Sequence, residues 1–183
     1  MKTKFALLSV LFILSSVLGV SALYAQSNSA TTTLNIKLNP IQTITVNPDQ
    51  KNVDLSYTTE KHYNDGVIAE KSKHLKVFST GGFQVKVKSG AVLSNGVATL
   101  DIQASDVTVK ATASGHTIAN LVVGTVALGT EKPFITSEKG GRNLEYDVTY
   151  NNELGKSDKY INHYKVNGNN TFTTTVTYTI AAN

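Results

Sequence analysis

Side chains able to catalyse a reaction or bind a metal are few in this sequence, and their spacing suits neither role. No serine lies in a Gly-x-Ser-x-Gly elbow, and the chain has no cysteine. Gly155-Lys156-Ser157 looks like the end of a phosphate loop, but Tyr150 stands where that loop needs its first glycine. The histidines form no His-x-His or His-x3-His pair, which favours surface positions in turns or strands. They are His62, His74, His116 and His163. We therefore predict no enzyme activity, no metal and no cofactor.

Oxygen-rich loops and tyrosines are the remaining candidates for a binding site. Residues 64–66 and 151–158 are rich in Asn, Asp and Glu, but neither loop matches a calcium-ligand spacing, which favours ordinary solvated turns. Tyr160 and Tyr164 lie in a polar segment, where exposed rings could stack on a sugar. These two residues therefore form the predicted ligand loop. Three other tyrosines fall on the same face of their predicted strands as apolar residues and are predicted to be buried: Tyr146, Tyr150 and Tyr178.

Composition indicates one β-rich domain. Charged residues make up 16% of the 183 residues, well below the roughly 25% of an average soluble domain. Threonine, valine, asparagine and serine are abundant, which favours strands over helices. Lysine and arginine do not cluster, so the chain lacks the basic footprint of a nucleic-acid-binding protein.

The N-terminus has the pattern of a cleaved secretory signal peptide. Lys2 and Lys4 precede an apolar stretch over residues 5–20, and a small-residue segment ends at Ala25. The apolar stretch is shorter than the roughly 20 residues of a membrane-spanning helix. We predict cleavage after Ala25, with Ala22 as the alternative site and an uncleaved membrane anchor as the alternative role. Cleavage would remove two lysines and lower the formal charge from +4 to +2.

The rest of the chain alternates apolar and polar residues in short runs, as strands with one buried face do. The first run covers 31–46 and is interrupted by Pro40, which cannot donate a hydrogen bond to a neighbouring strand. Residues 79–82 have the length and glycine content of a hairpin turn. Further strands are predicted at 53–57, 75–77, 83–88, 97–102, 107–111, 118–128, 144–150 and 171–180, with one short helical turn near 67–73.

Parity within these runs predicts a sandwich of two sheets around one core. The predicted core residues are Val53, Leu55, Leu75, Val77, Phe83, Val85, Val87, Leu144, Val148, Val176 and Ile180.

The layout of the chain resembles a known family of surface proteins. It combines an extended N-terminal run with an Asn-Pro step over 31–41, a Val-Asp-Leu-Ser-Tyr strand at 53–57, and a final strand over 170–180 close to the C-terminus. In these features it resembles the CFA-type chaperone–usher pilins and related fimbrial-type surface proteins of Bacteroidetes. In such pilins an immunoglobulin-like sandwich lacks its last strand, and the N-terminal extension of a neighbouring subunit fills the gap.

The resemblance implies an all-β, immunoglobulin-like β-sandwich that is incomplete and completed by donor-strand exchange. The chain would divide into a signal peptide (1–25), an N-terminal extension that serves as donor strand (26–40) and the sandwich (41–183). Leu34, Ile36 and Leu38, which alternate with polar residues, would be the plug residues of the donor strand.

The implied function is a structural subunit of an extracellular filament or fimbria-like surface structure that serves adhesion. Its partners would be identical or related subunits, a periplasmic chaperone and an outer-membrane usher. It would be secreted through the periplasm to the cell surface. The alternative is a secreted monomeric β-sandwich module in which residues 34–38 pair within their own domain, while Tyr160 and Tyr164 recognise a host or cell-wall glycan or peptidoglycan.

Overall fold

A computed structural model describes residues 28–118 and 120–183 of the chain. The predicted signal peptide and its cleavage sites lie outside the described residues. Residues 28–41 contain no helix or strand, and Leu38–Asn183 form one compact unit.

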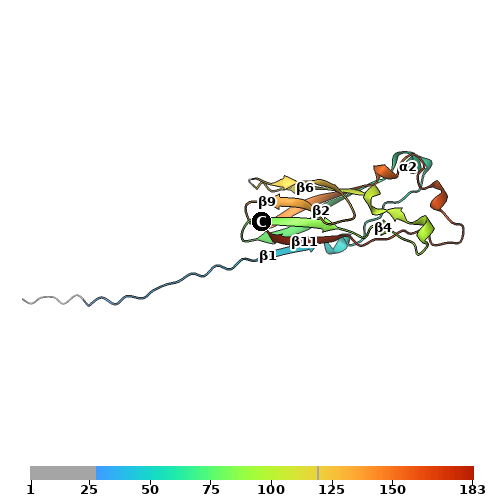
Figure 1. Cartoon of the computed structure of the whole chain (residues 1–183). Coiled ribbons are helices and arrows are strands. Elements are labelled where there is room, and N and C mark those ends of the chain that lie inside the picture. Colours follow the sequence, from blue (N-terminus) through green and yellow to red (C-terminus); the bar gives the residue numbers. More distant parts are fainter. Residues whose placement is uncertain (1–27, 119) are drawn as a thin grey trace, which may run out of the picture. The chain divides into compact units, whose positions relative to one another are not determined.

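Two antiparallel sheets make up the body of this unit (Figure 1). The first sheet contains, in order across it, β1 (Gln42–Val46), β2 (Ile68–Ser79), β10 (Gly141–Asn151), β6 (Thr108–Ser114) and β8 (Thr125–Ala127). The second contains β11 (Thr177–Ala182), β3 (Phe83–Lys88), β9 (Lys132–Ser137) and β7 (Val122–Val123). The predicted all-β sandwich is confirmed, and it contains a single short α-helix among the described residues.

Short elements connect the strands. A two-stranded sheet pairs β4 (Val92–Leu93) with β5 (Ile102–Gln103). The helix α2 spans Glu60–Asp65, where the Thr59 hydroxyl accepts a hydrogen bond from the His62 backbone N–H and Gly66 ends the helix. The 3-10 helices are η1 (Pro48–Gln50), η2 (Ala98–Leu100), η3 (Ala104–Asp106), η4 (Glu153–Gly155) and η5 (Ile161–His163).

The core lies between the two sheets and contains most of the predicted residues. Seven predicted core side chains are buried: Leu75, Val77, Phe83, Val85, Val87, Leu144 and Val148. Tyr146 and Tyr150 are buried as predicted, and Tyr178 is half-buried. The other four predicted core residues, Val53, Leu55, Val176 and Ile180, are only half-buried and pack against the core from one side.

Several predictions about single segments are wrong. The turn at 79–82 does not join a hairpin, because β2 and β3 belong to different sheets. Residues 67–73 are not a helical turn, since most of them form the first half of β2. Residues 97–102 are not one strand, because Ala98–Leu100 form the 3-10 helix η2 and only Ile102 belongs to β5. The strand β9 was not predicted.

The sandwich has two distinguishable ends. The strand β1 begins and β11 ends at one of them, which we call the proximal end; there Gln42 pairs with Ser79, and Ala182 pairs with Phe83. The helix α2 and the small β4–β5 sheet lie at the other, distal end (Figure 1). Only Asn39, Pro40 and Ile41 separate Leu38 from β1.

Candidate functional site: an unfilled strand slot

Two extended segments face each other along one side of the sandwich without forming a ladder. Residues 52–58 follow β1, and residues 170–176 lead into β11; neither forms a named strand. Both alternate in burial as strands do. Val53, Leu55 and Tyr57 are half-buried between exposed neighbours, and so are Phe172, Thr174 and Val176. Each segment therefore has the backbone and the apolar face of a strand but lacks a strand partner.

The hydrogen bonds of these segments show the same deficit. The backbone groups of residues 53–57 make no hydrogen bond to any other described residue. In the second segment, Thr173 forms an isolated bridge with Ser94, with N···O distances of 3.0 and 3.1 Å, while the backbone groups of residues 172 and 174–176 make no such bond. An incoming strand could satisfy unpaired N–H and C=O groups of both segments.

Two adjoining hollows of about 680 and 450 Å³ lie along these segments. Both are lined by Val53, Leu55, Leu93 and Phe172. The first extends towards the middle of the sandwich, where core residues such as Val107 and Leu128 form its floor. The second extends to the distal end, where Tyr57 and Tyr164 line it. We call the continuous groove between residues 53–58 and 170–178 the strand slot.

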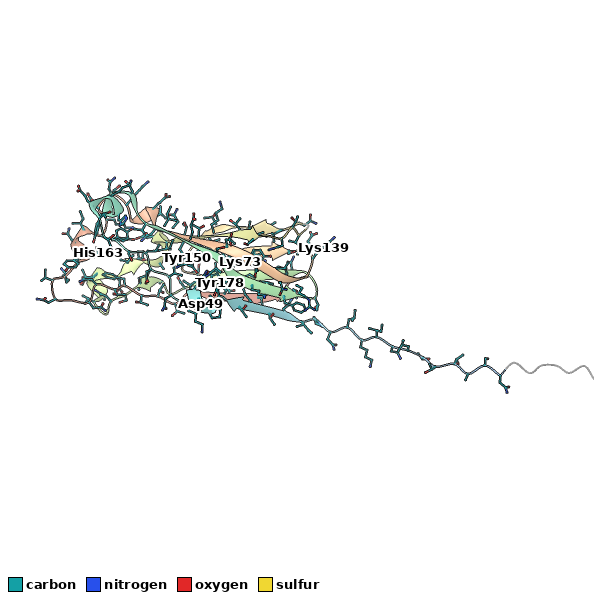
Figure 2. The ribbon with its side chains drawn as sticks, turned by 180° about the vertical axis from the view of Figure 1, so that it is seen from behind. Asp49, Lys73, Lys139, Tyr150, His163 and Tyr178 are labelled. Carbon is teal, nitrogen blue, oxygen red and sulfur yellow. The ribbon has the colours of Figure 1, made fainter. Side chains whose placement is uncertain are left out.

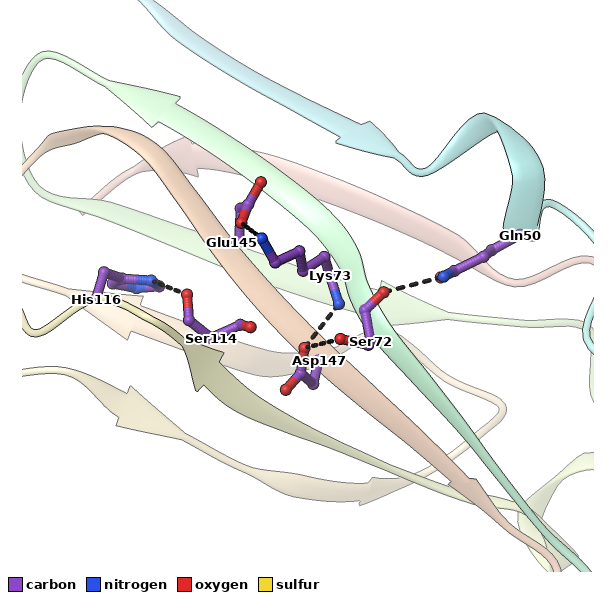
Figure 3. Close-up of polar contacts among 7 residues, drawn as sticks. All are labelled: Gln50, Ser72, Lys73, Ser114, His116, Glu145 and Asp147. Carbon is purple, nitrogen blue, oxygen red and sulfur yellow. Dashed lines mark hydrogen bonds and ion pairs between the residues drawn. The ribbon is translucent and has the colours of Figure 1, made fainter.

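A chain of polar groups lines the slot, and its two central members, His74 and Tyr150, are buried. Gln50 donates from Nε2 to the Ser72 carbonyl at 2.9 Å (Figure 3). Its Oε1 therefore faces His74 Nδ1, at 3.0 Å. His74 Nδ1 is then the donor, and His74 Nε2 accepts from the Tyr150 hydroxyl at 2.8 Å. The Tyr150 oxygen lies 2.7 Å from the hydroxyl of Tyr178. This row of hydrogen-bonded side chains joins the core to β11, which is one wall of the slot. Figure 2 shows Tyr150 and Tyr178 in the middle of the molecule.

His74 owes its buried position to an irregularity in β2. Lys73 has a φ of +49°, its backbone N–H donates to Asp147 Oδ1 at 2.6 Å, and its ammonium pairs with Glu145 (Figure 3). This bulge places His74 and Leu75 in the interior one after the other. The imidazole is 2% exposed, and burial lowers its pKa, with a smaller contribution from Lys71. The expected surface position of His74 is thus wrong.

A second polar cluster supports the distal end of the slot. Asp106 on η3 accepts from Lys159 Nζ at 2.6 Å and from the Tyr160 hydroxyl at 2.7 Å. Burial and the bond to Asp106 raise the pKa of Tyr160 above its usual range. Tyr57, beside Tyr160, has its pKa raised to about 12, mainly by burial. This cluster holds the loop after β10 against the body of the sandwich.

The predicted ligand loop divides into one buried and one exposed ring. Tyr160 is 5% exposed and its hydroxyl is bonded to Asp106, so it cannot stack on a sugar. The prediction of an exposed Tyr160 is wrong, because Asp106 offers a buried acceptor that sequence spacing does not reveal. Tyr164 is 61% exposed and lines the distal hollow.

The predicted plug residues carry their side chains into solvent. Leu34, Ile36 and Leu38 are 86%, 81% and 89% exposed, and their segment forms no strand. Large apolar side chains in an alternating row are unusual as solvent-exposed residues and are typical of a segment that binds elsewhere. The chain thus contains both an alternating apolar segment with exposed side chains and a groove lined by backbone groups without hydrogen-bond partners.

No protein-family model matches this chain, and no curated protein sequence matches it. Within residues 28–118 and 120–183, no group of three or more His, Asp or Glu side chains is placed to hold a metal ion. No helix in the described part of the chain is long and apolar enough to span a membrane. The candidate site therefore rests on the geometry of the slot and on the sequence of the extension.

Proposed function

We propose that this protein is a structural subunit of an extracellular filament or fimbria-like surface structure that serves adhesion. Subunits assemble when residues 31–38 of one copy occupy the strand slot of the next. The observation that carries the proposal is the slot itself, whose two walls both have strand-like burial and unpaired backbone. Strand addition to such an edge supplies ladder hydrogen bonds, while alternate side chains fill the pockets beneath.

The apolar side chains supply most of the binding free energy. Burying Leu34, Ile36 and Leu38 contributes roughly 1.5–3 kcal/mol each before the cost of ordering the extension. The slot offers apolar surface to receive them, since Val53, Leu55, Phe172 and Val176 are all incompletely covered. Exclusion of water from these surfaces also strengthens the new backbone hydrogen bonds.

The orientation of the donor strand follows from where the slot is closed. At the proximal end β1 packs against β11, so the two walls of the slot meet there and leave no space for a third strand. The slot widens beyond Val46 and reaches the distal end at Thr58 and Asn170. The donor's own domain follows Leu38 in the chain, so it must lie outside the open, distal end of the slot. The donor therefore places Leu38 in the distal hollow and Leu34 near the middle, antiparallel to residues 170–178.

Chain length favours donation to another copy over self-insertion. If the extension folded back at residues 39–41, Leu38 would lie opposite Gln42 and Leu34 opposite Val46, in the register of a hairpin with β1. The five residues of β1 are about 16 Å long, and the slot begins only at their end. The plug residues would then lie along β1 and leave the distal hollow empty. Donation in trans is heterologous and generates an open, head-to-tail filament.

The test uses the secreted chain without residues 1–25 and compares two substitutions of opposite parity. Ile36→Asp places a charge in an apolar pocket, whereas Asn35→Asp places the same charge on the outward face of the donor strand. We expect fibres of the parent and of Asn35→Asp in negative-stain microscopy, and only monomers of Ile36→Asp. Equal polymerisation of both variants, or a parent that stays monomeric at every concentration, would contradict the proposal.

One observation favours a second candidate function, glycan binding by a secreted module. Tyr164 is exposed beside the distal hollow, next to the amide of Asn170 and the ring of His163. An aromatic ring with neighbouring amide groups suits a sugar ring. Glycan-array binding by the non-polymerising Ile36→Asp chain, lost in a further Tyr164→Ala variant, would support this function. If the Ile36→Asp chain bound no glycan on the array, glycan binding would be ruled out as its function.

A further inference from the structure

A rigid loop with exposed apolar side chains forms the rim of the slot at its distal end. Tyr164 and Val166 on this loop are 61% and 79% exposed. Asn170 holds the loop in shape, because its side chain accepts from the Lys165 N–H at 2.8 Å and donates to the Lys165 carbonyl at 2.9 Å. Tyr164 also lines the distal hollow, so the loop adjoins the place where Leu38 of a donor would sit.

The residues that follow the donor strand are apolar as well. Pro40 shares the parity of Leu34, Ile36 and Leu38, and lies two residues, or about 7 Å, beyond Leu38. Ile41 is 52% exposed. Its backbone is fixed at the proximal end by two hydrogen bonds with Thr80, one from Ile41 N to Thr80 Oγ1 at 2.9 Å and one from Thr80 N to the Ile41 carbonyl at 3.0 Å.

These facts limit where the donor's own domain can lie. From Leu38 to Ile41 the chain spans at most about 11 Å, and Ile41 is attached to the proximal end of its domain. A donor whose Leu38 occupies the distal hollow must therefore bring its proximal end against the distal rim of its neighbour. The exposed side chains of the rim and of the linker then meet.

We propose that Tyr164 and Val166 form a docking surface for Pro40 and Ile41 of the donor copy. This inference rests on the proposed function and adds a second contact between subunits, outside the strand slot. The occupant is a second copy of this chain, because the short linker leaves no room for another protein at the rim. The contact would fix the angle between successive subunits, because hydrogen bonds hold both sides: Asn170 bonds the backbone of Lys165, and Thr80 bonds the backbone of Ile41.

Cysteine cross-linking tests the docking surface directly, because the chain contains no cysteine of its own. A disulfide requires Cα atoms about 4.4–6.8 Å apart. The full secreted chain carrying Ile41→Cys and Val166→Cys should form a covalent ladder when polymers are oxidised with copper–phenanthroline. The matched control, Ile41→Cys with Val122→Cys, uses another exposed valine, on the opposite edge strand β7 of the second sheet, and should form no ladder.

A second variant separates this inference from the proposed function. Val166→Ser should raise the critical concentration for polymerisation about tenfold, the effect of losing one partly buried valine contact. It should leave unchanged the affinity of a synthetic peptide of residues 28–38 for the Ile36→Asp chain. No peptide binding would overturn the strand slot itself. Peptide binding with normal polymerisation and no Ile41–Val166 ladder would overturn only the docking surface.

Discussion

The two long sides of this sandwich are built in opposite ways. On one side the chain closes the gap itself: β7 pairs in the second sheet, β8 pairs in the first, and Gly124 between them bonds to both. The Gly124 N–H donates to the Phe134 carbonyl at 2.9 Å, and its own carbonyl accepts from the Ala111 N–H at 3.4 Å. On the other side, residues 53–57 and 170–176 lie apart with a hollow between them.

The difference shows what a single switching segment does for a sandwich. Residues 122–127 seal one side because they contribute hydrogen bonds to both sheets in succession. Residues 42–57 begin in the same manner, with β1 in the first sheet, but their continuation finds no strand to pair with in the second. The open side therefore leaves the backbone of residues 53–57 without a partner, and the proposed function assigns the exposed apolar row at 34–38 to it.

The largest expected effect contrasts two phenylalanines. Phe134 in β9 is buried, and Phe134→Ala should lower the free energy of unfolding by about 3–5 kcal/mol because it leaves a cavity in a closed core. Phe172 on the slot wall is half-buried, and Phe172→Ala should cost the monomer less than about 2 kcal/mol. Urea denaturation of both variants in the Ile36→Asp background measures the difference. Equal losses would show that the slot is already closed in the monomer.

The polar cluster at the distal end should have an intermediate effect. Asp106→Ala removes the acceptor of the Tyr160 hydroxyl and should destabilise the domain by about 1–3 kcal/mol, because a buried donor loses its partner. Lys159→Met removes a half-exposed cation but leaves the Asp106 carboxylate bonded to the Tyr160 hydroxyl, and should cost less than Asp106→Ala. Thermal unfolding distinguishes the two. A larger loss for Lys159→Met would mean that the ion pair, not the tyrosine bond, holds the loop.

A smaller effect is expected from pH. Burial lowers the pKa of His74 in the folded state, so the unfolded chain, with its ordinary histidine pKa of about 6.5, binds the proton more readily. Stability should therefore fall as pH drops below about 6.5, by at most about 1.4 kcal/mol per pH unit until the folded pKa is reached. The melting temperature of the Ile36→Asp chain between pH 7.5 and 5 measures this. His74→Gln should flatten the profile, and an unchanged profile would place the acid sensitivity elsewhere.

Sequence patterns predicted the faces of the strands better than their partners. In β3 the alternation of Phe83, Val85 and Val87 with polar residues correctly indicated the buried face, because period two reports which side of a strand is covered. The same pattern at 53–57 and 171–176 predicted paired strands, yet those segments form no ladder, and their one bridge joins Thr173 to Ser94. Alternation carries no information on whether a neighbouring strand exists, and this is why the slot itself could not be predicted from parity.

Irregular positions account for the remaining errors. Pro133 and the consecutive buried pair Phe134–Ile135 break the alternation of β9 where its register with β3 shifts. The bulge at Lys73 changes the parity of β2, so the burial of His74 could not be read from spacing. Asp106 approaches Tyr160 across the fold from more than fifty residues away in sequence. The candidate plug residues were selected from the alternation of apolar and polar residues alone, and their role stays a prediction.

Amide hydrogen exchange in assembled filaments is the most direct test of the missing strand. The backbone N–H groups of 53–57, 172 and 174–176, which are unpaired in the monomer, should exchange rapidly in the Ile36→Asp chain. Those that the donor strand bonds should exchange slowly in polymers of the parent chain. The N–H groups of 122–127 should be equally protected in both, because that side is closed within each subunit. Protection of residues 31–38 together with the two slot walls would match the account. Polymers in which the slot amides still exchange at the monomer rate would contradict it.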